Sequence, residues 1–159
     1  MNPKYFLIVA LSYFFIACIY TPNIEYKLPS IWDKNFSITI YEGGGMAYES
    51  MSILFSFDSC KYVQMNNGIN KIKRFKLSAK EKEAVLIKLN SFNAGAIETT
   101  KTQELIHDKE TNQICFVTNT QSQHCLETGA TIRIKEKYQQ NFNNTYNYLT
   151  ALAISKTNK

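Results

Sequence analysis

Two segments in the first half of the chain alternate between apolar and polar residues. In the first, Phe36, Ile38 and Ile40 are separated by Ser37 and Thr39. The second has an apolar side chain at every second position, at Met51, Ile53, Phe55 and Phe57. Successive side chains of a strand point to opposite faces. Each segment therefore predicts a strand with one buried face.

A predicted hairpin follows these strands. Residues 60–65 and 69–77 have the composition of strands, and the sequence Asn66-Asn67-Gly68 between them is typical of a tight turn. The alternation changes phase at Arg74-Phe75. This change indicates a bulge or a strand end at that point.

Helical spacing replaces alternation after residue 77. Ser78 and Glu81 form a capping-box pattern, which predicts a helix start at this point. One apolar stripe of that helix contains Val85, Leu86, Leu89 and Phe92. The segment 93–97 ends the helical pattern. We expect the apolar stripe to lie on the sheet.

The remaining chain predicts more strands and a second helix. Residues 102–108, 112–119 and 123–128 are short apolar stretches separated by polar turns, and 131–135 could form a strand or lead into a helix. The C-terminal residues with helical spacing are Tyr138, Phe142, Tyr146, Leu149 and Ala153. The order of elements predicts an α+β domain over residues 36–155, in which two helices pack on one face of an antiparallel β-sheet.

The N-terminal residues 1–17 have the layout of a secretory signal. One positive charge at Lys4 precedes an apolar run that ends at Ala17. A membrane-spanning helix needs about 20 mostly apolar residues, and this run is shorter. A cleaved signal is therefore favoured over a transmembrane anchor, which is the alternative.

The end of this signal resembles the lipobox of bacterial lipoproteins. The matching residues are Phe15, Ile16, Ala17 and Cys18, with Phe15 in place of the usual leucine. The resemblance implies that Cys18 carries lipid, so that this residue contacts the membrane. An ordinary cleaved signal with an incidental cysteine is the alternative.

Residues 18–35 are expected to be a lipid anchor followed by an extended tether. Pro22 and Pro29 favour extended neighbours, and no periodic pattern runs through the segment. No acidic run follows Cys18. We therefore expect a lipid-anchored protein of the bacterial cell envelope, on the periplasm-facing side of the outer membrane.

The folded part as a whole resembles a family of small Bacteroidota lipoproteins. The segments that carry the resemblance lie within residues 36–155 and include FSITIYEGGGM, KRFKLSAKEKEAVLIKLNSF, ELIHDKETNQICFV and IKEKY. The family implies a single α+β domain behind a lipid anchor, with no established activity. Two features depart from the family pattern, namely Tyr48 in place of tryptophan and DKETNQ in place of a glycine-bearing turn.

Three consecutive glycines, Gly43, Gly44 and Gly45, raise the question of a phosphate-binding loop. Such a loop needs a Lys after the glycines and a helix N-terminus, whereas here Met46 and a predicted strand follow. We therefore predict no nucleotide cofactor. The glycines predict a structural bend, a bulge or a close backbone approach.

Cysteines suggest a disulfide rather than a metal site. Cys115 and Cys125 are equally distant from Thr120, so a hairpin centred there would place them opposite each other. In an oxidising compartment they could form a cross-strand disulfide, leaving Cys60 as the odd thiol. A metal site of Cys115, His124, Cys125 and His107 lacks the usual ligand spacing, so no metal is predicted.

The charge pattern contains one local basic patch. The chain has 18 Lys and Arg against 13 Asp and Glu, and the sequence KIKRFK concentrates part of this excess. These charges would keep an exposed edge strand soluble, and contact with anionic headgroups is the alternative. The secretory signal argues against a nucleic-acid partner.

No recognisable catalytic constellation accompanies these features. The two histidines are His107 and His124, and His107 is adjacent to Asp108 on a predicted strand, so that the two side chains point apart. The sequence thus predicts a membrane-anchored envelope lipoprotein that acts as a non-enzymatic protein-binding module for an unknown envelope protein. A small extracytoplasmic hydrolase with an unidentified site is the alternative.

Overall fold

The main element of the fold is a six-stranded antiparallel sheet with the order β4-β3-β2-β1-β6-β7. The structure, a computed structural model, describes residues 26–44, 49–102, 110–119 and 122–158. The strands of this sheet are β1 (Phe36–Gly44), β2 (Glu49–Phe55), β3 (Cys60–Asn66), β4 (Ile69–Phe75), β6 (Glu110–Thr118) and β7 (Ser122–Thr128).

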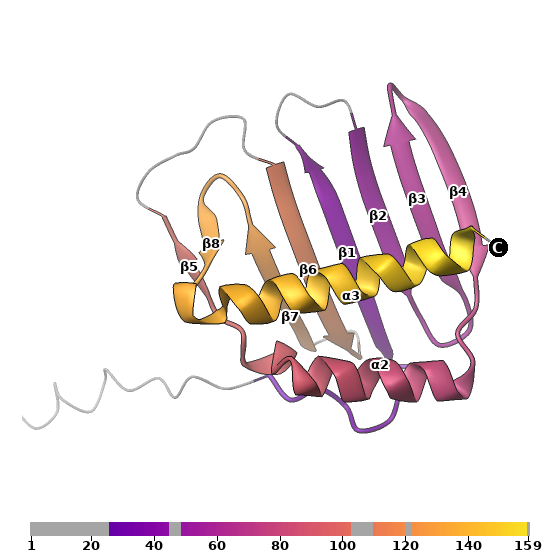
Figure 1. The fold of residues 1–159 in the computed structure, drawn as a ribbon, viewed down its shortest axis with the longest axis horizontal. Helices are drawn as coiled ribbons and strands as arrows, with labels where there is room; N and C mark the ends of the chain where they lie inside the picture. Colours follow the sequence, from indigo (N-terminus) through magenta and orange to yellow (C-terminus); the bar gives the residue numbers. More distant parts are fainter. Residues whose placement is uncertain (1–25, 45–48, 103–109, 120–121, 159) are drawn as a thin grey trace, which may run out of the picture.

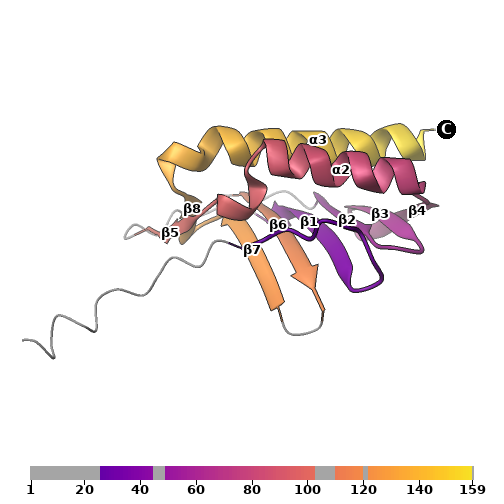
Figure 2. The same cartoon turned by 90° about the horizontal axis from the view of Figure 1, so that it is seen from below.

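Two helices cover one face of this sheet (Figures 1 and 2). They are α2 (Ala79–Ser91) and α3 (Gln139–Thr157), and α3 crosses the strands to contact β4. The predicted α+β class, with both helices on one face, is confirmed.

A small second sheet lies beside β7. It pairs β5 (Thr99–Lys101) with β8 (Ile132–Ile134), and 3-10 turns at Ala94–Ala96 and Glu136–Tyr138 flank it. The strand β5 was not predicted, since three residues give no readable alternation. The strand predicted at 102–108 falls almost entirely outside the described residues.

The β3–β4 hairpin has the predicted turn. Asn67 and Gly68 have φ angles of 49° and 79°, and Asn66 pairs with Ile69 across them. Positive φ at both central residues is the geometry of a type I′ turn, which matches the twist of the two strands. The strand ends at Phe75, where the alternation changes phase.

The start of α2 also follows the prediction. The Ser78 backbone N–H donates to Glu81 Oε2 at 2.8 Å, and the Glu81 backbone N–H donates to Ser78 Oγ at 3.3 Å. This reciprocal pair is the capping box. The buried residues of α2 are Val85, Leu86 and Leu89.

The core lies between the sheet and the helices. The fully buried side chains of the sheet include Ile38, Ile40, Ile53, Phe55, Ile114, Phe116 and Leu126. From above, α3 contributes Phe142, Leu149 and Ala153. β1 and β2 therefore each bury one of their two faces, as the alternation predicts, whereas β4 is exposed on both faces up to Phe75.

The folded part begins earlier than Phe36, which corrects the predicted tether. Leu28 and Trp32 are only 8% and 4% exposed and belong to the core, and the Trp32 ring lies edge-on to Phe36 at 5.0 Å. A Cβ on Gly95 would overlap the Tyr26 carbonyl oxygen, so glycine permits this segment to lie against the domain. Residues 26–35 are thus part of the domain, and any free tether is confined to residues before 26.

Candidate functional site

The second face of the six-stranded sheet carries no helix formed by the described residues (Figure 2). We call it the outer face. On β2, Ile53 and Phe55 point to the core and are fully buried, whereas Leu54 between them is 37% exposed. Among the described residues, the large hydrophobic side chains exposed on this face are Tyr41, Leu54, Met65 and Ile72.

Several of these side chains are neighbours on β2, β3 and β4. Val63 lies directly opposite Ile72, and it is two residues from Met65 on the same strand. Val63 also lies opposite Ser52, which places Leu54 diagonally beside it. Directly opposite and diagonal side chains on one face of a sheet are close enough to touch. Leu54, Val63, Met65 and Ile72 therefore form one apolar patch, which we call the outer patch.

Two cations border the outer patch. Lys61 and Arg74 lie directly opposite each other on β3 and β4, and Lys61 also pairs with Leu54 on β2. None of the ion pairs between described residues includes either cation. Like charges placed directly opposite each other destabilise a sheet.

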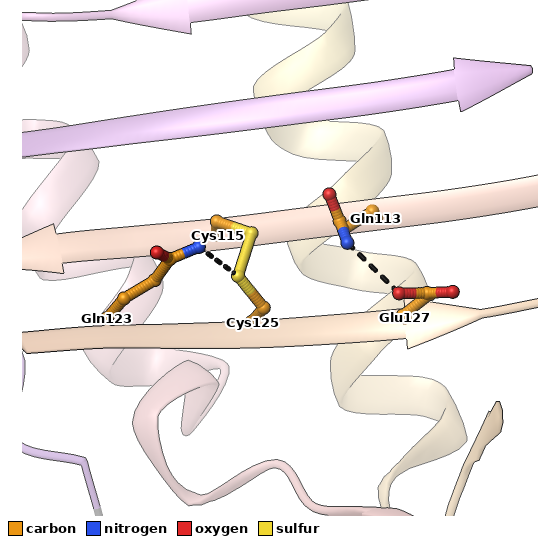
Figure 3. Close-up of a disulfide and its surroundings, with 5 residues drawn as sticks. All are labelled: Gln113, Cys115, Gln123, Cys125 and Glu127. Carbon is orange, nitrogen blue, oxygen red and sulfur yellow. Dashed lines mark hydrogen bonds between the residues drawn. A yellow bond between two sulfur atoms is a disulfide. The ribbon is translucent and has the colours of Figure 1, made fainter.

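The predicted cysteine pair also lies on the outer face. Cys115 and Cys125 are direct partners in the β6–β7 register and are joined by a disulfide. Figure 3 shows the disulfide on the side of the strands away from the helices. Gln123 Nε2 donates to Cys125 Sγ at 2.7 Å.

The disulfide indicates an oxidising, extracytoplasmic compartment. Cys60 is a buried free thiol, and burial raises its pKa. Within the described part of the chain, no helix combines the length and hydropathy needed to span a membrane.

Two of the three glycines for which a bend was predicted are residues of strand β1. Gly43 and Gly44 are strand residues that pair with β6, and Gly44 has a φ of 96°. A Cβ on Gly43 would lie 2.8 Å from both Ser50 Cβ and Tyr41 Oη. Gly43 therefore leaves room for the Tyr41 side chain to lie along the outer face. Gly45 falls outside the described residues.

A pocket of about 510 Å³ lies between β7 and the segment that leads into β5. Within this lining, Glu98 accepts a hydrogen bond from Tyr138 Oη at 3.0 Å. Glu98 also forms ion pairs with Lys135 and, at 3.8 Å, with Lys137. Two lysines therefore balance this carboxylate, which ties the small sheet to the start of α3.

His124 forms one wall of this pocket. Its ring stacks on Tyr26 at 5.0 Å and on Phe116 at 6.3 Å. Burial lowers the pKa of His124, against the smaller effect of a hydrogen bond with the backbone of Ile97. Its Nε2 is inaccessible to solvent and has no hydrogen-bond partner among the described residues. The stacked rings of Tyr26, Phe116 and His124 show that this imidazole packs against the core.

Three of the four residues considered for a metal site lie in the described part of the chain. The disulfide occupies Cys115 and Cys125, and His107 falls outside the described residues. Within the described ranges, no three potential ligands from His, Cys, Asp and Glu come together.

The outer patch was not predicted from the sequence. Its signal was present, because Leu54 occupies a polar position of the β2 alternation and Ile72 lies within KIKRFK. Each is a single apolar residue on the expected solvent face, and such residues are common on surfaces. Only the register brings them together. No protein-family model and no curated protein sequence matches this chain, so the resemblance to Bacteroidota lipoproteins stays a prediction.

Proposed function

We propose that this chain is a lipid-anchored protein of the bacterial cell envelope that binds a partner protein through the outer face of its sheet. The observation that carries the proposal is the outer patch, which lies on the face that neither α2 nor α3 covers. Leu54 and Ile72 are 37% and 51% exposed, and β2 buries its other face fully at Ile53 and Phe55 on either side of Leu54. Contiguous apolar surface of this kind is typical of protein interaction sites.

The extracytoplasmic disulfide supports the envelope location, and the lipobox at Cys18 supports the anchor. Because Tyr26 already packs on His124, the seven residues from Ile19 to Glu25 form the longest possible free tether. Seven extended residues reach at most about 25 Å. The proposed anchor would hold the binding face close to the membrane, on the periplasm-facing side of the outer membrane.

A small hydrolase is the second candidate, and the pocket beside His124 is the observation that favours it. The side chains of that pocket fit a hydrolase site less well than the outer patch fits a protein-binding site. Glu98 is balanced by lysines, and His124 Nε2 is enclosed. If the pocket is catalytic, turnover of an ester or peptide substrate will be lost in His124→Gln.

Site-specific photocrosslinking in the producing cells tests the binding face. Benzoylphenylalanine at position 72 should give a discrete adduct on the outer face. The matched control is position 87, because Ile87 is 61% exposed on α2, in the helical layer. The adduct at position 72 should weaken when Leu54→Thr is added. Equal adducts at positions 72 and 87, or no effect of Leu54→Thr, would contradict the proposal.

The anchor has a separate test. Cys18→Ser should abolish labelling by a fatty-acid analogue and release the processed protein from the membrane fraction. Cys60→Ser is the control. Because Cys60 is buried in the domain, this substitution should leave labelling unchanged. Membrane attachment that persists in Cys18→Ser would favour an uncleaved N-terminal helix.

A further inference from the structure

We infer that the partner presents an acidic surface to Lys61 and Arg74, with carboxylates flanking an apolar side chain that covers the outer patch. This inference rests on the proposed function and names the chemistry of its partner. It starts from the position of the two cations. They face each other across β3 and β4, where their repulsion opposes strand pairing.

The described residues do not neutralise this pair. Neither Lys61 nor Arg74 takes part in an ion pair with another described residue. Lys73, on the other face of β4, differs from them because its Nζ donates to the Thr157 carbonyl oxygen at 2.8 Å, at the end of α3. A carboxylate supplied by a partner would remove the repulsion between the two cations and form charge-assisted hydrogen bonds.

The cations and the outer patch are close enough for one partner to cover both. Lys61 is the direct cross-strand partner of Leu54, and Arg74 is two residues from Ile72 on β4. An apolar centre beside a charged rim is the usual composition of a protein interface. The rim charges would contribute mainly to the association rate and to specificity.

A protein suits the outer face better than an anionic lipid surface does. Glu127 lies on the same face at the opposite edge of the sheet, where Gln113 Nε2 donates to its Oε2 at 3.0 Å (Figure 3). A uniformly anionic membrane would attract the Lys61 edge and repel the Glu127 edge. A protein can match both signs.

Peptide binding measured by fluorescence anisotropy tests the inference with the full chain in a neutral detergent. The probes are extended peptides in which Glu, Leu and Glu occupy every second position with Thr between them, so that all three point to one face, and matched peptides with Gln in place of each Glu. The Glu peptide should bind about tenfold more tightly than the Gln peptide, and its affinity should fall as salt is raised. The double variant Lys61→Gln/Arg74→Gln should abolish the difference. The control Lys80→Gln/Arg133→Gln removes the same net charge elsewhere and should preserve the difference.

The outcomes separate this inference from the proposed function. Equal binding of the two peptides, or an unchanged preference in Lys61→Gln/Arg74→Gln, overturns the acidic partner. If Leu54→Thr still weakens the cellular adduct at position 72, the binding face itself survives that result. Two other results would assign Lys61 and Arg74 a different role and would also overturn the inference. One is binding of Cys18→Ser to phosphatidylglycerol vesicles that depends on Lys61 and Arg74, and the other is self-association that depends on the same residues.

Discussion

Cys115 and Cys125 lie directly opposite each other on neighbouring strands, and their disulfide closes the β6–β7 hairpin on the outer face. The bond joins residues separated by 10 positions. In the chain-entropy description, a loop of this size stabilises the folded state by about 2–3 kcal/mol. The disulfide thus stabilises the pairing of the edge strand β7 with β6, in addition to indicating an oxidising compartment.

Loss of this disulfide should lower the free energy of unfolding by about 2–3 kcal/mol. The change is Cys115→Ser/Cys125→Ser, and the measurement is denaturant unfolding followed by circular dichroism. Reductant should destabilise the wild type by a similar amount and leave the double variant unchanged. If reductant affects both proteins equally, the stabilisation does not come from this bond.

Trp32→Ala should destabilise the domain by about 3–5 kcal/mol, because it removes a large side chain that is 4% exposed. The adjacent Ile31 provides the matched control, because its side chain is 75% exposed. Ile31→Ala should change stability by less than about 0.5 kcal/mol. Thermal unfolding of both variants distinguishes a segment that is part of the core from a free tether, for which the two substitutions would have equally small effects.

Local signals in the sequence predict much of the sheet and the first helix. The turn at Asn67 and Gly68 sets the β3–β4 register, and residues equally distant from it lie opposite each other. That register already places Lys61 against Arg74. The capping box at Ser78 likewise marks the start of α2 correctly.

The N-terminal segment could not be predicted in the same way. Leu28 and Trp32 are buried in a stretch without helix or strand, so no periodic pattern in the sequence predicts their burial. Their position depends on contacts made far along the chain, such as the close approach of Tyr26 to Gly95. The outer patch has a similar origin, because it depends on the register of three strands rather than on one segment.

The capping carboxylate predicts a pH dependence of stability. The Lys156 ammonium, together with the Ser78 backbone N–H and hydroxyl, lowers the pKa of Glu81 to about 2, from an ordinary value of 4.5. The pKa of Glu81 is lower in the folded state than in the unfolded state. The ionised carboxylate therefore contributes fully to the free energy of unfolding above about pH 4.5, and this contribution is lost as the pH falls toward 2. Partial exposure of the Glu81 side chain limits the contribution to about 1 kcal/mol or less.

Glu81→Gln should therefore destabilise the domain at pH 7, and the difference from wild type should shrink steadily between about pH 4.5 and pH 2. The control is Glu83→Gln, an exposed position of the same helix outside the capping box. Unfolding measured across this pH range should show no comparable convergence for Glu83→Gln. A difference for Glu81→Gln that stays constant to pH 2 would contradict the role of its charge.

The last prediction separates folding from binding on β2 and β4. Ile72→Thr keeps a β-branched side chain on the 51% exposed outer face, and it should change the free energy of unfolding by less than about 0.5 kcal/mol. Ile53→Ala, on the fully buried inner face, should cost about 2–5 kcal/mol. Denaturant unfolding gives both values. If Ile72→Thr is nearly as costly as Ile53→Ala, the outer patch is covered within the chain itself and is not free for a partner. A small cost instead means that the apolar side chain at position 72 contributes little to folding, which fits a surface that is covered on binding.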